Sequence, residues 1–399
     1  MVGCPNRPVA AGERLRIVQV FNRYLEAGGE ARSVERMAGD LEAAGHRVLR
    51  FWRATSEWSA DGTAARLKRP FLMVNNRKVL ADLRRLDEQE RPHFWLLHNV
   101  LPVISLGVFR LAREVGAPVI QWLHNYRPLS PSGSLFAQGR RLDPRQAGRV
   151  WREVLAGRYH GPLATAWLAL TYARLRWRGD FESVRAWVAI SEGARRVFAE
   201  AGWYPDRLRV LRHAWHIRPD SPRPSEDDGS LLFLGRMVEE KGVRFLVNLW
   251  QRPELRQRRL VLAGTGPWEA RLRRAPGANI EWVGPLAGEE KQRFLARCRA
   301  VLVPSLWEEP LGLVTYEAYE QARPVLASRM GGLPETVFDG VTGRLLPPGD
   351  MAAWSQAILA LDRPAAVRLG AAGRRWLEQN TSPARWVQGF EELVRPVLG

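Results

Sequence analysis

Long apolar runs and cysteines are both scarce in this chain of 399 residues, and each scarcity excludes a class of protein. No apolar run reaches the roughly 18 residues that a membrane-spanning helix needs, and the N-terminal stretch MVGCPNRPVAAGERLRIV lacks the apolar centre of a signal peptide. With only Cys4 and Cys298, the chain can build neither a disulfide framework nor a cysteine metal site. We therefore expect a globular protein that stays in the cytoplasm.

Lysine is rare as well, yet the chain is strongly basic. The 60 Lys and Arg residues outnumber the 42 Asp and Glu residues and give a formal net charge of +18, although only four residues are lysines: Lys68, Lys78, Lys241 and Lys291. A charge of this size suits an anionic partner, such as nucleic acid, an acidic membrane surface or a phosphorylated substrate. A compositional bias toward arginine explains it equally well, so the charge alone selects no function.

Apolar, β-branched segments alternate with amphipathic segments twice along the chain. In the first half we expect strands at residues 15–21, 46–52, 93–99, 118–125, 186–191 and 207–213, and helices at 30–44, 103–115 and 192–201. After the Pro-rich, acidic stretch RPDSPRPSEDDGS, strands are expected near 230–236, 258–267, 279–284, 300–305, 324–328 and 342–348. Such alternation is typical of parallel sheets with helices on both faces.

The predicted fold class is therefore α/β, with two Rossmann-like domains that face a central cleft. A chain of this length exceeds what one hydrophobic core usually serves. We place the N-terminal domain at residues 1–217, a linker at 218–230, the C-terminal domain at 231–383 and a C-terminal helix at 384–399. Because open parallel sheets bind ligands at the carboxyl ends of their strands, the cleft between the domains is the expected site.

Two glutamates bracket the expected start of a helix in the segment PSLWEEPLGLVTYEAYEQARPVLAS, residues 304–328. We expect the helix to begin near residue 311 or 312, with its first unpaired amides on Gly312, Leu313 and Val314. Such amides can bind an anion. Glu309 precedes this helix and Glu317 lies about one turn along it. Carboxylates accept hydrogen bonds from the vicinal hydroxyls of a sugar or ribose. The segment is therefore typical of a nucleotide-sugar site.

Two further motifs follow predicted strands of the second half and suit the same ligand. In FLGRMVEEKG, Arg236 comes just after a strand and Lys241 opens the next helix, so both cations can reach a diphosphate. In LAGTGP, Gly264 and Gly266 allow the backbone to approach a ligand closely. Each motif alone is equally compatible with a solvated loop or a simple turn. Their order at successive strand ends favours a common site.

Taken together, these motifs resemble those of retaining glycosyltransferases of the GT-B fold, specifically glycosyltransferase family 4. The second half matches through GRMVEEKG, LAGTGP, the E-x7-E pattern of VPSLWEEPLGLVTYEA, and GGLPETVFDGVTGRLLPPGD at 331–350. The first half is similar, through GGEARSVERMAGDLEAAGHRV, LLHNVLP and LHNYRPLSPSGSLF, to members that build bacterial surface polysaccharides. The resemblance covers nearly the whole chain. It implies an N-terminal acceptor domain, a C-terminal donor domain and a last helix that returns to the first domain.

The resemblance implies roles for the second-half residues. Arg236 and Lys241 would neutralise the donor diphosphate and stabilise the leaving nucleotide. Glu309 would contact hydroxyls of the transferred sugar, and Glu317 would hold the ribose. Glu308 stands next to Glu309, and only the spacing of the family's motif favours Glu309 for this role.

In the first half, the resemblance places three residues close to the reaction. Gly28 and Gly29, after the first strand, would let the backbone approach the donor phosphate and the acceptor, and His124 would lie beside the anomeric carbon. By spacing alone, His124 and His98 are equally compatible with buried histidines at strand ends. The chain has EPLG, with a Pro–Leu pair at 310–311, where the family commonly has EGFG, so sugar selectivity stays open.

The predicted function is hexose transfer from a UDP- or GDP-linked sugar to a hydroxyl of a saccharide or lipid-linked acceptor, in cell-surface polysaccharide or glycolipid synthesis. Retention of configuration is implied by the family. We expect no metal and no cofactor besides the nucleotide sugar, because cations and amides can stabilise the leaving diphosphate and no D-x-D follows a predicted strand. A nucleotide-sugar 2-epimerase of the same fold is an alternative. A basic nucleic-acid-binding protein is another, although the sequence contains no aromatic and basic RNA motif.

One segment also suits a membrane surface. Residues 149–185 mix Trp, Tyr and Arg around an apolar centre, which is typical of a helix that lies on an anionic bilayer. The same pattern is expected of helices that cover the first domain and shape the acceptor pocket. We therefore expect a cytoplasmic protein for which the inner face of the cytoplasmic membrane is a candidate partner.

Overall fold

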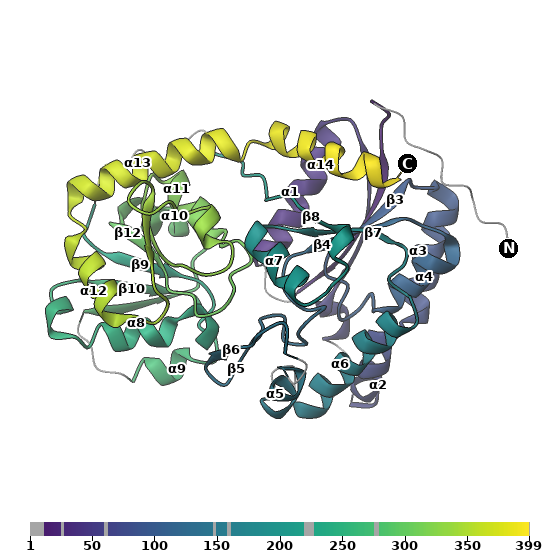
Figure 1. The fold of residues 1–399 in the computed structure, drawn as a ribbon, viewed down its shortest axis with the longest axis horizontal. Coiled ribbons are helices and arrows are strands. Elements are labelled where there is room, and N and C mark those ends of the chain that lie inside the picture. The colour runs from purple at the N-terminus through teal and green to yellow at the C-terminus, as the bar shows by residue number, and fades with distance from the viewer. Residues whose placement is uncertain are drawn as a thin grey trace.

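The computed structural model describes residues 12–24, 28–59, 63–146, 149–157, 161–218, 227–274 and 279–398. Figure 1 shows two α/β halves side by side, with the last helices running along one edge of both. Cys4 and most of the predicted linker at 218–230 lie outside the described residues. None of the helices in these ranges is long and apolar enough to cross a membrane.

The first half is built on a parallel sheet of six strands in the order β2-β1-β3-β4-β7-β8. The strands are β1 (Arg16–Arg23), β2 (Arg47–Ala54), β3 (Phe94–Leu97), β4 (Val119–Leu123), β7 (Val184–Ala189) and β8 (Leu208–Val210). The central strands β3 and β4, FWLL and VIQWL, are buried throughout, as expected where helices cover both faces of a sheet.

The helices of this half are α1 (Gly29–Ala43), α2 (Thr63–Val74), α3 (Arg77–Glu90), α4 (Gly107–Val115), α5 (Arg149–Leu155), α6 (Pro162–Trp177) and α7 (Glu192–Glu200). A small antiparallel hairpin of β5 (Phe136–Ala137) and β6 (Arg140–Arg141) reaches toward the second half. The sequence did not predict this hairpin.

The second half repeats the architecture with the strand order β11-β10-β9-β12-β13-β14, again parallel. Its strands are β9 (Leu231–Leu234), β10 (Leu260–Ala263), β11 (Ile280–Gly284), β12 (Ala300–Val303), β13 (Val325–Ser328) and β14 (Gly343–Leu346). Its helices are α8 (Val243–Leu249), α9 (Glu269–Leu272), α10 (Gly288–Arg297), α11 (Val314–Glu320), α12 (Met351–Ala360) and α13 (Arg363–Asn380). The predicted fold class, with two parallel sheets flanked by helices, is confirmed.

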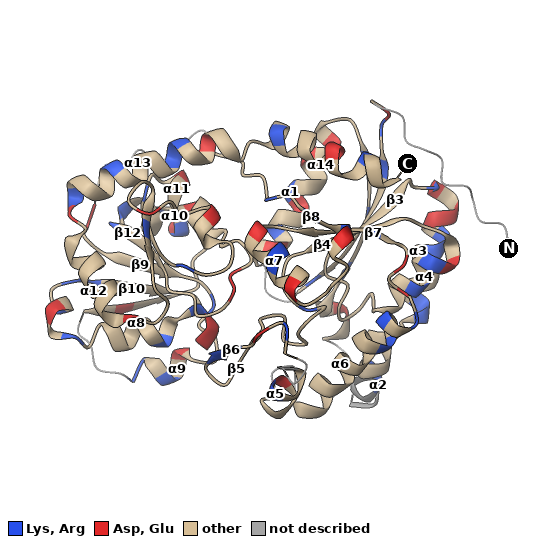
Figure 2. Ribbon diagram, viewed as in Figure 1, with Lys and Arg blue, Asp and Glu red and all other residues tan. Residues whose placement is uncertain are grey.

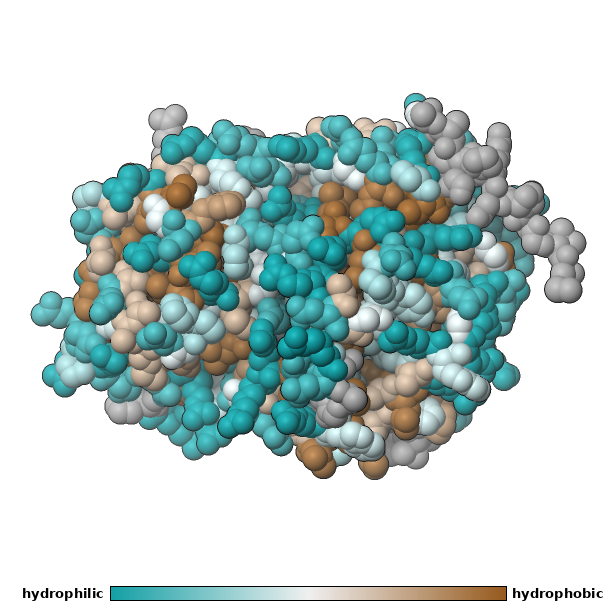
Figure 3. All heavy atoms as spheres, viewed as in Figure 1, coloured by the Kyte–Doolittle hydropathy of each residue, from teal (hydrophilic) through white to brown (hydrophobic). Residues whose placement is uncertain are grey.

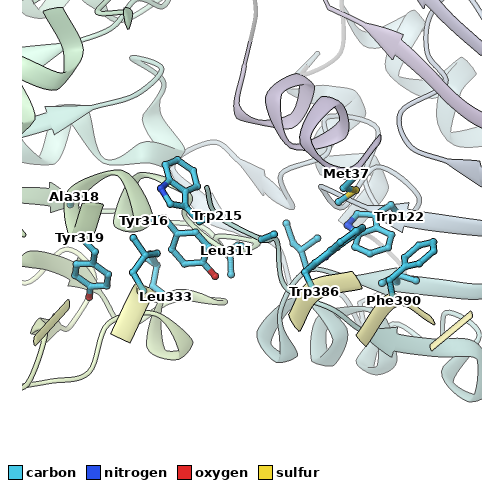
Figure 4. Close-up of a cluster of buried hydrophobic side chains, with 14 of the residues drawn as sticks. Met37, Trp122, Trp215, Leu311, Tyr316, Ala318, Tyr319, Leu333, Trp386 and Phe390 are labelled. Carbon is cyan, nitrogen blue, oxygen red and sulfur yellow. The ribbon is translucent and has the colours of Figure 1, made fainter. Parts of the chain in front are cut away.

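One buried cluster crosses from one half to the other (Figure 4). Near the second sheet, Trp215 meets Tyr316 edge to face at 5.9 Å. Near the first sheet, Trp386 of the last helix, α14 (Pro383–Leu398), lies 5.9 Å from the ring of Trp122. The C-terminal helix therefore contacts the first half, and packing of aromatic side chains helps to fix the position of the two halves.

Candidate active site

A buried ion pair lies at the strand ends of the second sheet. Lys241 closes the turn after β9, and its Nζ donates to both carboxylate oxygens of Glu309, at 2.7 and 2.8 Å. Ser305 Oγ and Trp307 Nε1 donate to Glu309 Oε2, at 2.9 and 3.0 Å. Burial by itself raises the pKa of Glu309, but the charge of Lys241 and these hydrogen bonds outweigh it and lower the pKa overall. Glu309 is therefore an ionised carboxylate that accepts four hydrogen bonds, three at Oε2 and one at Oε1.

The second predicted carboxylate has a lysine partner of its own. Glu317 lies on α11, and its Oε1 accepts a hydrogen bond of 2.7 Å from Lys291 Nζ of α10. The side chain of Lys291 is 8% exposed and that of Glu317 is 17% exposed. The two lysine–glutamate pairs thus belong to the same α/β half, one on each side of the start of α11.

The start of α11 differs from the prediction, because the helix begins at Val314 rather than near residue 311 or 312. Gly312 has a φ of +82°, a left-handed conformation that does not continue into a helix. A Cβ on Gly312 would also come within 2.7 Å of Leu333 Cδ2. Within the described chain, the amides of Gly312, Leu313 and Val314 donate to no protein acceptor. Three consecutive N–H groups are therefore available to a ligand at this point.

The motif that contains Arg236 and the motif that contains Gly264 and Gly266 lie next to each other, because β9 and β10 are neighbours in the sheet. Met237 N donates to Thr265 O at 2.7 Å, and a Cβ on either Gly264 or Gly266 would overlap a backbone carbonyl of the loop after β9. Arg236 is exposed in that loop. The structure thus brings Arg236, Gly264 and Gly266 together, and the glycines are required by this close approach of two backbones.

Three histidines meet at the strand ends of the first sheet. His124 follows β4, and its Nε2 lies 3.0 Å from Nδ1 of His98, which follows β3. The ring of His213 stacks on His124 with 5.4 Å between centroids. Burial lowers the pKa of His98 and of His213 to about 3, with further lowering of His98 by His213, and it lowers the pKa of His124 well below its ordinary value. All three rings are therefore neutral near pH 7.

Glu30 lies in the first turn of α1 and is a site residue that the sequence analysis missed. It lines a cavity together with His98, Asn99, His124 and Arg127. Burial raises the pKa of Glu30 to about 7, against the opposing effects of Arg127 and of a backbone hydrogen bond from Asn99. Its Oε1 is buried and accepts no hydrogen bond from any residue that the structure describes. The only signal in the sequence is its position directly after the Gly28–Gly29 pair.

The two halves contact each other directly around these groups. Gly28 precedes α1 and Gly29 begins it, and a Cβ on Gly29 would lie 3.3 Å from Leu313 Cδ1. In the loop between β12 and α11, residues 304–313, Pro310 O accepts a hydrogen bond of 2.5 Å from Ser191 Oγ of the first half. Of the two glycines predicted for the first half, Gly29 is therefore placed against the residue that precedes α11, whereas a Cβ on Gly28 would meet nothing within 4 Å.

Glu308 and Glu309 point to different partners. Glu308 pairs with Arg141 of the β5–β6 hairpin and accepts a hydrogen bond of 2.9 Å from Gly331 N. Glu309 is bonded to Lys241 instead. Glu308 therefore joins the two halves, whereas Glu309 lies among the groups of the second sheet.

Glu335, in the turn after β13, caps a helix of the opposite half. It accepts hydrogen bonds from the backbone N–H groups of Glu192 and Gly193, at 2.9 and 2.7 Å, at the start of α7. We expect Glu335→Ala to lower the free energy of unfolding by about 1 kcal/mol, the usual effect of a lost helix cap. Urea unfolding at neutral pH measures this difference.

Glu192→Ala is the matched control for that variant. Glu192 is a neighbouring glutamate that makes an exposed pair with Arg195, and such pairs contribute little. If both variants lose the same stability, Glu335 does not act as a cap between the halves.

Comparison with known proteins gives a consistent result. The family described as "Glycosyl transferases group 1" matches residues 228–363. Glycogen synthase of Mycobacterium tuberculosis is 35% identical over 403 aligned residues, which cover 93% of this chain and 92% of the relative. D-inositol 3-phosphate glycosyltransferase of Mycobacterium bovis is 27% identical over 98% of this chain and 85% of its own length.

Among solved structures, sucrose-phosphate synthase of Thermosynechococcus elongatus is similar with a TM-score of 0.68 and 19% identity, over 96% of this chain and 99% of its own. The Anabaena protein HepE, solved in complex with UDP-glucose, is similar with a TM-score of 0.65 and 17% identity, over 96% of this chain and all of its own. At these identities, the structural likeness concerns the fold.

Proposed function

Because the chain belongs to the group 1 family of glycosyltransferases and has the GT-B fold, we propose that it transfers a hexose from a nucleoside-diphosphate sugar to a hydroxyl of a saccharide or lipid-linked acceptor. We propose further that the transfer retains the anomeric configuration and serves the synthesis of a cell-surface polysaccharide or glycolipid at the inner face of the cytoplasmic membrane. The observation that carries this proposal is the occurrence, around the start of one helix, of two lysine–glutamate pairs and of three amides that have no acceptor among the described residues.

In this proposal the donor diphosphate binds among the positive groups that follow β9 and precede α11 in the second half. Cleavage of the anomeric C–O bond leaves negative charge on the diphosphate, and preorganised donors stabilise such charge most effectively in a site that excludes water. Lys241 and Arg236 supply two cations, and the amides of residues 312–314 supply three donors. Glu309 holds Lys241 in place and would accept a hydrogen bond from a hydroxyl of the sugar, while Glu317 would accept hydrogen bonds from the ribose hydroxyls.

We propose that the reaction needs no metal ion, because Lys241 and Arg236 can take the role that a cation has in stabilising a leaving diphosphate. Among the described residues, no group of three or more His, Cys, Asp or Glu side chains is placed to hold a metal. Equal activity in the presence of a chelator and of added Mg²⁺ is the expected result, and a strict requirement for Mg²⁺ would contradict it.

The acceptor hydroxyl would enter from the side of the first sheet. It attacks the anomeric carbon on the face of the leaving group, so the new C–O bond forms as the old one breaks and the hydroxyl proton passes to the diphosphate. The neutral ring of His124 can exchange hydrogen bonds with the sugar without adding charge. The carboxyl of Glu30, which lines the same cavity as His124, would accept a hydrogen bond from the acceptor.

The first test is calorimetric titration with UDP, GDP and their common sugar conjugates, without added metal. We expect saturable binding of one nucleotide. Glu317→Ala should weaken it at least about tenfold, because hydrogen bonds to charged groups contribute about 1.5–3 kcal/mol. Glu290→Ala, an exposed glutamate of α10, should leave the affinity unchanged.

Two outcomes would overturn the proposal for the donor site. If neither the uridine nor the guanosine nucleotides bind, a nucleotide sugar is not the substrate. If Glu317→Ala and Glu290→Ala bind the nucleotide with equal affinity, Glu317 does not belong to the site. Incubation with the bound nucleotide sugar in the absence of an acceptor separates transfer from 2-epimerisation, since only an epimerase then yields a new nucleotide sugar.

A further inference from the structure

Helix α6 is apolar on both of its faces. The inward face carries four buried residues: Thr165, Leu168, Thr171 and Leu175. The outward face carries large exposed side chains at helical spacing: Leu163, Trp167, Leu170 and Trp177. Leu163 is 88% exposed and Trp177 is 86% exposed. Large apolar side chains on a helix are normally covered. Helix α2 covers part of the outward face at Trp167, which stays 40% exposed, whereas Leu170 is 66% exposed.

Two neighbouring helices extend this face into a patch. Phe71 of α2 meets Trp167 edge to face at 5.6 Å, and Trp167 Nε1 donates to Pro70 O at 3.0 Å. On the other side, α5 adds two exposed residues, Trp151 and Leu155. We call the set of seven the apolar patch: Phe71, Trp151, Leu155, Leu163, Trp167, Leu170 and Trp177. Figure 3 shows apolar surface at the lower edge of the molecule, where α5 and α6 lie in Figure 1.

The charge around the apolar patch is positive. Neither α2 nor α6 contains Asp or Glu, and no acidic residue is coloured along α6 in Figure 2. Exposed cations flank the patch at Lys68 of α2, at Arg152 of α5, and at Arg174, Arg176 and Arg178 at the end of α6. Tryptophan and arginine around an apolar centre fit the interface of an anionic bilayer, where each nearby cation contributes about 1 kcal/mol.

The position of α6 relative to the cavity of the first half adds a separate argument. Tyr172 of α6 lines the same cavity as His124 and Glu30. One side of this helix therefore borders the cavity, while the apolar patch lies on the other side. The cavity and the apolar patch are therefore separated by the thickness of one helix, about 10 Å.

We propose that the apolar patch rests on an anionic lipid bilayer and holds the cavity of the first half close to the membrane surface. A second copy of the chain is a less suitable partner, because a two-fold contact would bring cations together with no acidic residue on α2 or α6 to pair with them. Lipid headgroups of negative charge supply that complement. The further step, that the acceptor is lipid-linked, rests on the proposed function.

Flotation with vesicles tests the membrane contact independently of activity. The full-length protein should float with vesicles of phosphatidylcholine and phosphatidylglycerol, and should stay unbound with phosphatidylcholine alone. Raised salt should weaken the binding, because screening reduces the contribution of exposed charges. Leu170→Glu/Trp177→Glu should reduce binding at least about tenfold, since an acidic residue at the interface is repelled by the anionic lipid.

Leu359→Glu/Val367→Glu is the matched control, because both residues are exposed apolar positions on α12 and α13 of the other half. The control should float like the parent protein. Nucleotide binding should be equal in all three proteins, so a failure of flotation is distinguishable from a failure of the donor site. No flotation of the parent, or equal flotation of both double variants, would overturn the proposal. A dimer that Leu170→Glu/Trp177→Glu dissociates, without vesicle binding, would assign the patch to a contact between copies.

Discussion

Replacing Lys241 with Met should reduce kcat/KM for sugar transfer by about 10³-fold, and it should also destabilise the protein. In the proposed function Lys241 is a cation at the place where charge develops on the leaving diphosphate, and single preorganised donors of this kind are worth about 10²–10³ in rate. Steady-state kinetics with the nucleotide sugar identified by titration measures this loss.

The effect on stability has a different cause. Glu309 is 5% exposed and accepts two hydrogen bonds from Lys241. Breaking a buried pair by removing one partner leaves an uncompensated charge and costs about 3–5 kcal/mol. The remaining bonds from Ser305 and Trp307 compensate for only part of this cost. Urea unfolding at neutral pH should show the loss directly.

A double variant separates the two effects. Lys241→Met/Glu309→Gln removes the unpaired charge, so it should recover most of the lost stability and none of the lost transfer activity. Arg244→Met is the matched control, since Arg244 lies three residues further along and pairs with Glu239 at the surface. If the double variant regains activity, Lys241 acts only by neutralising Glu309 and has no role toward the diphosphate.

The second large effect is a loss of stability in mild acid. His98 and His213 have a pKa of about 3 in the folded protein, against an ordinary value of 6.5. The folded state therefore binds fewer protons than the unfolded chain below pH 6.5, so stability falls as the pH falls through this range. At about pH 5 each histidine should cost about 2 kcal/mol, because this pH lies about 1.5 units below the ordinary pKa and each unit is worth about 1.4 kcal/mol.

Two variants test the origin of this pH dependence. His213→Phe keeps the stacked ring, and the Nδ1 of His213 has no hydrogen-bond partner among the residues that the structure describes. This variant should lose less stability than the parent between about pH 7 and about pH 5. Glu30→Gln should have the opposite effect, because the raised pKa of Glu30 favours the folded state as the pH falls through this range. An unchanged pH profile in His213→Phe would contradict the assignment.

The sequence predicted the sheets well because their strands are buried on both faces. Segments such as LVLA at 260–263 and AVLV at 300–303 are apolar at every position, which is the pattern of a central parallel strand. The β5–β6 hairpin has two residues in each strand. A strand of that length has no periodicity to detect, so the hairpin and the Arg141–Glu308 pair that it provides were not predicted.

The site was predictable as a set of residues and unpredictable as a set of contacts. Lys241 and Glu309 were both identified, but they are 68 positions apart, and their pairing appears only when β9 and β12 lie side by side. The assembly of His98, His124 and His213 has the same origin, because three different strands end there. Glu30 is recognisable only from its burial in the shared cavity.

Three successive residues of the loop between β12 and α11 have different partners. Residue 308 pairs with Arg141, residue 309 pairs with Lys241, and the carbonyl of residue 310 accepts a hydrogen bond from Ser191. The first and third of these partners belong to the opposite half of the molecule. Any ligand that holds this loop therefore also holds the two halves together, and by linkage the free energy that favours closure is returned as tighter binding. If the nucleotide of the proposed function binds at this loop, its affinity and the order between the two halves form one coupled equilibrium. A substitution far from the phosphates would then change the affinity through the position of the first half alone.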